Sequence, residues 1–280
     1  MIKDVPCGHN KLIFYKSVNR WQIYRCDNCG LLITVVNQGS GNINKDIYND
    51  RYIKAYEEKK DELKKRFLKQ FELIRKYKKG GKILDIGCGL GYFLQVVEND
   101  RAWTAYGLEI NKKLALLAKK NTVADIHIGS LNALPYDKNS MDCITCFDVL
   151  EHDIDLYRNL INIRRILKTK GIIVIQCPNY KSLMQYLSGS HWDWWSPPDH
   201  ILHLTPKTLT TYLRRCGFSI LYSTTYEPTR DFWYNVKFAL CRNVFCKLIL
   251  YTFAPTLLVI KYISDVLGYG ALTFIIAIKD

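Results

Sequence analysis

Residues 82–91 read Lys-Ile-Leu-Asp-Ile-Gly-Cys-Gly-Leu-Gly, an apolar run that ends in an acid and opens into a glycine-rich turn. The apolar part is typical of a central strand, and Asp85 stands at its end. The glycines that follow (Gly87, Gly89 and Gly91) permit a sharp turn and a close approach of the backbone to a ligand. A turn built for pyrophosphate has glycine at the place of Asp85. A nucleoside with a cationic centre therefore suits this loop better than a diphosphate.

A second acid ends the next apolar segment. Residues 106–109 read Tyr-Gly-Leu-Glu, so Glu109 stands at the end of a second predicted strand. In dinucleotide-binding folds an acid at this place accepts hydrogen bonds from ribose hydroxyls. A glycine-rich turn alone is weak evidence. The strand, the first acid, the glycines and Glu109 together indicate a nucleoside site.

With these residues the chain resembles the class I S-adenosylmethionine (SAM)-dependent methyltransferases. Residues 129–152 resemble the third loop and fourth strand of that family, residues 165–171 the turn before its fifth strand, and residues 176–179 the end of that strand. The resemblance extends over roughly residues 50–280. It implies an α/β fold with a Rossmann-like seven-stranded sheet, helices on both faces, and SAM across the ends of the first two strands. The alternative is a Rossmann-like domain for another nucleotide.

The resemblance also implies which residues form the cofactor site. The family often has an acid after the third strand that meets the adenine amino group, whereas this chain has Ser130 and Leu131. A backbone group or Asn132 would then make that contact. Phe147 either lines the methyl-donor site or belongs to the core. The candidates for cofactor binding are Asp85, Gly87, Cys88, Gly89, Gly91, Glu109, Ser130, Leu131 and Phe147.

Short apolar runs alternate with amphipathic segments along the chain, which predicts a parallel sheet with covering helices. We expect strands at 82–86, 103–109, 125–128, 142–148, 171–177, 218–226 and 271–278, and helices at 91–99, 111–120, 155–168 and 206–216. Three units are expected: a small cysteine-bearing unit at 1–36, a linker and basic amphipathic helix at 37–81, and the methyltransferase domain at 82–280. An apolar, helical insertion is expected at 232–267, before the last strand.

The cysteine-bearing unit has the spacing of a zinc knuckle. Residues 26–30 read Cys-Asp-Asn-Cys-Gly, and two thiolates at this spacing can hold one metal ion. A second knuckle should oppose it, but residues 4–9 read Asp-Val-Pro-Cys-Gly-His. The unit resembles the four-cysteine ribbon that precedes the catalytic domain in several class I methyltransferases. We therefore expect a structural zinc in a zinc-ribbon-like unit, with Cys7, Cys26 and Cys29 as ligands and either Asp4 or His9 as the fourth. A site that no longer binds metal is the alternative.

Groups that could take part in catalysis follow the fourth predicted strand. Asp148, Glu151 and His152 stand at a strand end that borders the ligand crevice in doubly wound sheets. A base is needed there only if the methyl acceptor must lose a proton. The segment resembles quinone-precursor O-methyltransferases, in which this spacing has been associated with magnesium. A magnesium site is therefore expected. The alternative is that Glu151 orients the next helix and His152 packs as an ordinary polar side chain.

A second cluster of candidates lies in residues 189–204, a proline-bearing loop with three tryptophans and three histidines. Relatives with the ribbon carry a similar tryptophan followed by Pro-x-His-x-x-His. We expect His200 and His203 to bind the acceptor or to act as base. We expect Trp192 and Trp195 to enclose an apolar or ring-shaped substrate. The alternative is a lid that is packed by its own aromatic side chains.

The chain is strongly basic, with 40 Lys and Arg against 26 Asp and Glu and a formal net charge of +14. Residues 54–82 carry a large share of this excess. Such a surface attracts the phosphates of nucleic acids, lipid headgroups or nucleotide-linked sugars, although a solvated helix face is the alternative. The apolar run at 248–260 is too short to span a bilayer, which takes about 20 residues. Residues 237–263 cover the active site, pair with another subunit, lie in a membrane interface, or are buried in the protein.

We predict a SAM-dependent methyltransferase for a small-molecule or lipid- or sugar-linked acceptor, with O-methylation favoured. Two alternatives stay open: a zinc-ribbon-containing RNA methyltransferase, and a non-catalytic scaffold with this fold. The RNA enzyme is disfavoured because the chain has no Asn-Pro-Pro-Tyr motif. Most of the ten cysteines fall in predicted strands and helices, and the first ten residues lack the features of a signal peptide. Both observations favour reduced thiols in the cytoplasm, with contact at the inner face of a membrane as a further expectation.

Overall fold

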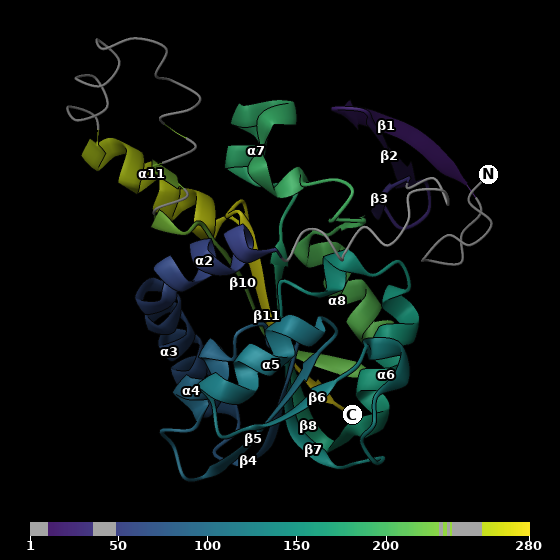
Figure 1. The fold of residues 1–280 in the computed structure, drawn as a ribbon. Helices are drawn as coiled ribbons and strands as arrows, with labels where there is room; N and C mark the ends of the chain where they lie inside the picture. Colours follow the sequence, from purple (N-terminus) through teal and green to yellow (C-terminus); the bar gives the residue numbers. More distant parts are fainter. Residues whose placement is uncertain (1–10, 36–48, 230–231, 234–235, 237–253) are drawn as a thin grey trace.

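A seven-stranded sheet forms the centre of the molecule (Figure 1). The computed structural model describes residues 11–35, 49–229, 232–233, 236 and 254–280. β11 runs antiparallel to both of its neighbours, and the other pairs are parallel. The Rossmann-like seven-stranded sheet expected from the sequence is thus confirmed. In spatial order the strands are β10 (Phe218–Tyr226), β11 (Leu272–Lys279), β8 (Leu167–Pro178), β7 (Met141–Phe147), β4 (Gly81–Ile86), β5 (Trp103–Glu109) and β6 (Asp125–Ile128).

Helices cover both faces of this sheet, because successive strand residues point to opposite sides. On β7, Cys143 packs into one buried cluster and its neighbour Ile144 into the other. The first cluster is completed by α3 (Lys60–Tyr77), α4 (Tyr92–Val97) and α5 (Lys112–Asn121). The second is completed by α6 (Leu156–Ile166) and α8 (Pro206–Arg215). Figure 1 shows the two groups on opposite sides of the strands.

A small antiparallel sheet joins the beginning of the chain to the tryptophan–histidine loop. It consists of β1 (Leu12–Val18), β2 (Trp21–Cys26), β3 (Leu32–Thr34) and β9 (Leu202–His203), in that order. The last strand comes from the loop that follows β8, so the sheet is built from both parts of the chain. Cys26, Leu31 and Ile33 belong to the same buried cluster as α6 and α8. The small sheet therefore packs directly on the face of the central sheet that α6 and α8 cover.

The basic helical region consists of two helices in the described residues. α2 (Asp50–Glu58) begins at Asn49, whose side chain accepts a hydrogen bond from the Tyr52 amide at 3.0 Å. Lys59 interrupts the helix, and α3 continues from the next residue. The apolar residues of α3, among them Phe67 and Phe71, face the sheet. Its lysines are left at the surface, which accounts for the predicted basic face.

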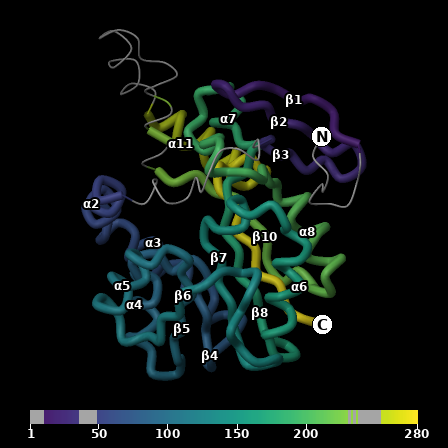
Figure 2. Tube along the Cα trace, turned by 45° about the vertical axis from the view of Figure 1, so that its right-hand side comes forward, coloured from purple at the N-terminus to yellow at the C-terminus, as the bar shows by residue number. Residues whose placement is uncertain are grey.

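The apolar insertion is described only in part, because its residues 237–253 lie outside the described residues. α11 (Ala254–Val266) is a helix, as expected, and it packs against β10. α7 (Leu183–Ser188) lies at the same end of the molecule in both views (Figures 1 and 2). No helix among the described residues is long and apolar enough to cross a bilayer.

Candidate functional site

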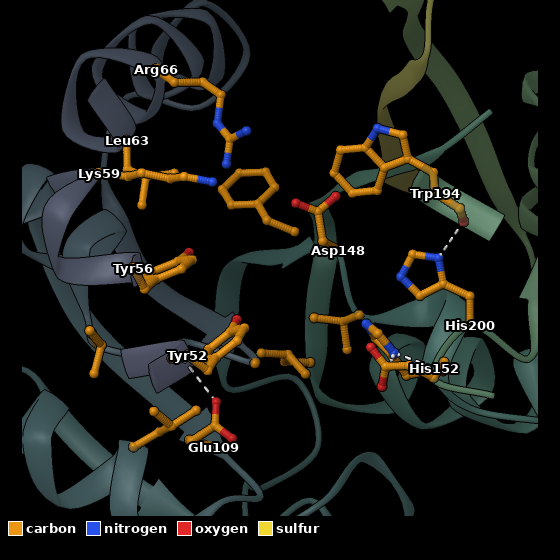
Figure 3. Close-up of a pocket in the computed structure, with 18 of the residues that line it drawn as sticks. Tyr52, Tyr56, Lys59, Leu63, Arg66, Glu109, Asp148, His152, Trp194 and His200 are labelled. Carbon is orange, nitrogen blue, oxygen red and sulfur yellow. Dashed lines mark hydrogen bonds and ion pairs between the residues drawn. The ribbon is translucent and has the colours of Figure 1, made fainter. Parts of the chain in front are cut away.

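One large cavity lies at the carboxyl ends of β4, β5 and β7, where ligands bind in open α/β sheets. Its volume is about 1020 Å³. Figure 3 shows Tyr52, Tyr56 and Arg66 on one side of it and His152 and His200 on the other. A pocket for one drug-sized ligand measures roughly 300–1,000 Å³. This cavity is therefore large enough for a nucleoside cofactor and a second molecule.

The glycine turn after β4 forms the floor of the cavity. Gly87 and Gly89 both line it, and both have left-handed backbone angles, with φ of +72° and +53°. A Cβ atom on Gly87 would lie 2.5 Å from a methyl carbon of Val149, whereas one on Gly89 would meet no atom within 4 Å. Gly91 does not line the cavity; it precedes α4, and a Cβ there would lie 2.4 Å from Thr122. The space above Gly89 is thus open to a ligand, while the other two glycines are required by packing.

Glu109 lies at the opposite side of this turn, at the end of β5. Its carboxylate accepts hydrogen bonds from the backbone amide of Gly89 at 3.0 Å and from that of Asn111 at 2.8 Å. The side chain lines the cavity and is only 5% exposed. Burial raises the pKa of Glu109, and the backbone hydrogen bonds oppose that rise. The carboxylate is therefore fixed in place beside the glycine turn, with lone pairs left for ribose hydroxyls.

Asp85 is placed beneath the turn rather than in the cavity wall. It is buried, and its carboxylate accepts a hydrogen bond from the Thr145 hydroxyl at 2.6 Å. Burial raises the pKa of Asp85 to about 7, although the bond to Thr145 lowers it. A nearby cation would favour the ionised form of this carboxyl.

The other predicted cofactor residues are divided between cavity and core. Ser130, Leu131 and Phe147 line the cavity. Phe147 also packs against Phe93, with ring centroids 5.0 Å apart, so both of its predicted roles are compatible with its position. Cys88 is buried and does not line the cavity. Its sulfur packs closely on Gly107 of the neighbouring strand, where an added Cβ atom would lie only 2.9 Å from it. Cys88 thus supports the turn from behind.

Sequence reasoning missed the contribution of α2. Tyr52 and Tyr56 line the cavity and stack on each other, with centroids 5.8 Å apart, and Tyr56 stacks in turn on Tyr92 at 5.9 Å. Burial raises the pKa of Tyr52 to about 12, and the charges of Asp199 and Glu109 add to this rise. In the sequence the two tyrosines fall within the basic amphipathic region expected at 37–81, and nothing there marks them as binding residues. Their position over the glycine turn depends on how α2 folds back, which no local pattern records.

Asp148, which lines the cavity, forms a polar network with Gln176, which is buried behind the cavity wall. The Gln176 amide donates to both carboxylate oxygens of Asp148, at 3.0 and 2.9 Å. Its own oxygen accepts from Gln70 at 2.6 Å and from the Tyr226 hydroxyl. Asp148 has a left-handed φ of +56°, an uncommon conformation for a residue other than glycine. Burial raises the pKa of Asp148, although the positive charge of Arg66 lowers it in part.

His152 is paired with Asp199 at the edge of the cavity. Its Nδ1 lies 3.0 Å from the Asp199 carbonyl oxygen and 3.2 Å from the Asp199 carboxylate. Burial alone would lower the pKa of His152, but the hydrogen bond to Asp199 and the charges of Glu151 and Asp199 raise it to about 9. His152 therefore holds its proton at neutral pH.

His200 faces His152, with ring centroids 4.9 Å apart. Its Nδ1 lies 2.7 Å from the carbonyl oxygen of Trp194, and the ring stacks on the Trp194 indole. Burial and the charge of His152 lower the pKa of His200 to about 4. This imidazole is therefore neutral, and it lines the cavity.

Glu151 and His203 are placed differently from what was expected. Glu151 is 1% exposed and lies behind the cavity wall, with ligand atoms close to those of His152 and His200. Within the described residues these three form the group that could hold a metal ion, whereas Asp148, expected with them for magnesium, is not a member. His203 lies in β9, where its Nε2 is 2.8 Å from the Thr34 hydroxyl. It is buried between the small sheet and Trp195 and does not line the cavity.

The tryptophan loop uses a different indole from those expected. Trp192 and Trp195 are 2% and 1% exposed, and they pack together with Val18 and Ile23 of the small sheet. Trp194 lines the cavity. The two buried tryptophans thus hold the loop in place. This agrees with the alternative expectation, a lid that is packed by its own aromatic side chains. Of the three indoles of this loop, that of Trp194 is the one that faces the cavity.

The zinc knuckle is described on one side only. Cys26 is buried and its carbonyl accepts from the Gly30 amide at 2.9 Å, which closes the expected turn. The Cys29 sulfur lies 3.7 Å from the Tyr212 hydroxyl. Asp4, Cys7 and His9 lie outside the described residues. The zinc site therefore stays a prediction.

Comparisons with known proteins agree with this architecture. Residues 52–223 match the family model described as "Methyltransferase domain". An uncharacterized protein of Methanocaldococcus jannaschii is 31% identical over 133 residues, which cover 47% of this chain and 51% of that protein. The "Probable S-adenosylmethionine-dependent methyltransferase" of Mycolicibacterium smegmatis is 28% identical over 142 residues, which cover 50% of this chain and 53% of that protein. The chain thus spans about half the length of these two relatives.

A longer match and a solved structure extend the comparison. The ubiquinone biosynthesis O-methyltransferase of Coxiella burnetii is 25% identical over 179 residues, covering 59% of this chain and 74% of that protein. The crystal structure of a SAM-dependent methyltransferase from Archaeoglobus fulgidus superposes with a TM-score of 0.57 and 23% identity, covering 81% of this chain and all of that one. The chain therefore belongs to the methyltransferase domain family, and it carries a class I SAM-dependent methyltransferase domain.

Proposed function

We propose that the protein transfers the methyl group of SAM to a hydroxyl oxygen of a small-molecule or lipid- or sugar-linked acceptor. The observation that carries this proposal is the division of one cavity into two halves with different chemistry. Gly89, Glu109 and Ser130 line one half, and Trp194, His152 and His200 line the other. Asp148 lies between the halves (Figure 3), and its neighbour in sequence, Phe147, also lines the cavity.

Methyl transfer from a sulfonium is a direct displacement, in which the acceptor oxygen attacks the methyl carbon and the sulfur leaves with the bonding electrons. The protein must then hold the two molecules in line and exclude water. On the cofactor side, Glu109 would accept the ribose hydroxyls, and Tyr52 and Tyr56 would cover the nucleoside. On the acceptor side, Trp194 offers a flat apolar surface.

An acceptor hydroxyl must also lose its proton, and this requirement supports O-methylation at the histidine pair. His152 already carries a proton at neutral pH because of Asp199. His200 is neutral, and its Nδ1 is engaged by the Trp194 carbonyl, so its Nε2 is the free acceptor. The similar Coxiella burnetii protein is named as an O-methyltransferase, which supports the same choice.

The exposed apolar side chains of α11 support a lipid-linked acceptor. This helix packs against β10, whose following residues Glu227 and Pro228 line the cavity. An apolar helix on a protein with a net charge of +14 suits an anionic membrane surface. We propose that the protein binds such a surface there and takes its acceptor from it. The exposed apolar residues of α11 are Leu258, Val259, Ile260, Tyr262, Ile263 and Val266, and the exposed Leu267 follows the helix.

The test uses SAM with a carbon-13 methyl group and extracts of host metabolites and lipids. The carbon-13 chemical shift of a transferred methyl separates an oxygen acceptor from nitrogen and carbon. We expect labelled O-methyl signals with the wild-type protein. His200→Gln should reduce the rate by about 100-fold or more while SAM binding is kept, because general-base catalysis contributes about 10²–10⁴-fold. Label on nitrogen or carbon, or an unchanged rate in His200→Gln, would contradict the proposal.

We also propose that the cysteine knuckle holds a structural zinc through Cys26 and Cys29, with Cys7 and either Asp4 or His9. Four protein ligands would leave no position for a reacting water. Removal of zinc should then loosen β1–β3 without changing the affinity for SAM. A metal-free protein whose N-terminal sheet melts at an unchanged temperature would refute this.

A further inference from the structure

Glu151, His152 and His200 bring three potential metal ligands together beside the cavity. One ligand atom from each lies within 4.8 Å of the other two. The first two residues follow β7 in a 3-10 turn, Leu150–His152, and the third comes from the tryptophan loop. The backbone joins the two segments, because the Ile201 amide donates to the Glu151 carbonyl at 2.8 Å. The cluster is thus built by the fold and not by neighbours in sequence alone.

The Glu151 carboxylate is the first sign that something is bound here. The residue is 1% exposed, and neither carboxylate oxygen has a hydrogen-bond partner among the described residues. The rings of His152 and His200 are near, yet no hydrogen bond or ion pair joins Glu151 to either ring. An unpaired buried carboxylate costs several kcal/mol. A cation between the three side chains would offset this cost.

The orientation of the two imidazoles is the second sign. Each ring places Nδ1 against a backbone carbonyl, His152 against Asp199 at 3.0 Å and His200 against Trp194 at 2.7 Å. A carbonyl can only accept, so Nδ1 carries the hydrogen in each ring. A metal ion binds only the neutral ring, so His152 would release its second proton on binding, and Nε2 of each ring then offers a lone pair. Metal-binding histidines are held in this way in nearly all sites, with the second nitrogen donating to a carbonyl or carboxylate.

We propose that Glu151, His152 and His200 bind one divalent transition-metal ion, of which zinc is the representative. Two imidazole nitrogens and one carboxylate are the donors such ions prefer, whereas magnesium prefers an octahedral shell of oxygens. Three protein ligands also leave a coordination position free, as in catalytic zinc sites. Both histidines line the cavity, so the free position is accessible from it.

The consequence for catalysis rests on the proposed function. An acceptor hydroxyl that occupied the free position would lose its proton more easily, because a bound metal ion lowers the pKa of a coordinated hydroxyl group. In the metal-loaded protein both Nε2 atoms would be held by the ion, so the hydroxyl proton would pass to water, whereas in the metal-free protein Nε2 of His200 would remain the base. His200→Gln would lower the rate in either case. The metal site itself does not depend on which atom is methylated.

The experiment titrates cobalt(II) into the full-length protein after treatment with a chelator. Cobalt at a nitrogen and oxygen site gives weak visible bands, whereas cobalt at the cysteine knuckle adds strong thiolate charge-transfer bands in the ultraviolet. We expect the weak bands to saturate at one equivalent in the wild type. Glu151→Gln, which keeps the shape of the side chain, should abolish them. Asp199→Asn removes the carboxylate charge 3.2 Å from Nδ1 of His152 but keeps the backbone carbonyl. It should weaken cobalt binding by about 10-fold, the lower end of the usual effect of changing a partner of a ligand histidine.

His191→Gln is the matched control, because His191 is an exposed histidine of the same loop and lies outside the cluster. It should leave the titration unchanged. Circular dichroism establishes that each variant folds, and His200→Gln replaces Glu151→Gln if the latter does not. The inference is overturned if wild type and variants take up cobalt equally, or if an excess of magnesium displaces the ion. S-adenosylhomocysteine binding, measured on the same metal-free samples, tests the cofactor site separately.

Discussion

Replacing Glu109 with glutamine should weaken SAM binding about 10- to 150-fold. The carboxylate accepts from two backbone amides, at 3.0 and 2.8 Å, and it is only 5% exposed. In Glu109→Gln one oxygen becomes an NH2 group, which cannot accept from a backbone amide or a ribose hydroxyl. The loss of one charge-assisted hydrogen bond in a buried place costs about 1.5–3 kcal/mol. Because each 1.4 kcal/mol changes an affinity tenfold, the expected range follows.

The assay is titration calorimetry with SAM and with S-adenosylhomocysteine, which has the same ribose but no sulfonium charge. Equal losses for both ligands would identify hydrogen bonding to the ribose as the cause, and a larger loss for SAM would identify charge attraction. Asp193→Asn is the matched control, since Asp193 also lines the cavity but is exposed and lies in the tryptophan loop. If Glu109→Gln binds both ligands within threefold of the wild type, Glu109 does not hold the ribose.

Three further outcomes are expected. Burial raises the pKa of Asp85 from 3.8 to about 7, so its contribution to stability is complete below pH 4 and is lost as the pH rises through 7. SAM binding near pH 7 should favour the ionised form of the Asp85 carboxyl and release protons. The calorimetric binding enthalpy should then depend on the buffer, and Asp85→Asn should abolish that dependence. Gly87→Ala should lower the free energy of unfolding by about 1–3 kcal/mol more than Gly89→Ala in urea titrations, because only the former Cβ meets a neighbouring methyl group, at 2.5 Å. A similar loss in both would show that backbone strain alone decides. Changing Val259 and Ile263 to serine should reduce cosedimentation with anionic vesicles but leave the melting temperature unchanged, since these side chains are 57% and 49% exposed. Undiminished vesicle binding would exclude α11 as the contact.

The central sheet could be predicted closely from the sequence. All seven predicted strands exist, and four of the predicted helices begin and end within a few residues of α4, α5, α6 and α8. The reason is local, because buried parallel strands are short apolar runs. Asn111 and Thr205 are also residue types that favour helix N-caps, and they mark where α5 and α8 begin. Glu109 and Gly89 could be placed together because strand ends in a parallel sheet meet at one edge.

The half of the cavity that Trp194, His152 and His200 line could not be predicted in the same way. Whether Trp192, Trp194 or Trp195 faces the ligand depends on one irregular loop, and the spacing of three nearby indoles does not decide it. His203 has the same residue type as His200, but β-pairing with β3 turns it into the small sheet. Glu151 could be named as a candidate, but its unpaired burial is a property of packing.

Under the proposed function, the pairing of β3 with β9 couples residues 11–35 to the binding of the methyl acceptor. A strand of two residues is not stable unless it is paired. The loop that carries Trp194 and His200 is therefore held in its conformation by the strands β1–β3. Cleaving that hairpin away should yield a protein that still captures the methyl donor yet presents no ordered surface to the molecule being methylated. Control over this enzyme could therefore be exerted from its outermost strands, far from the sulfur–carbon bond that breaks.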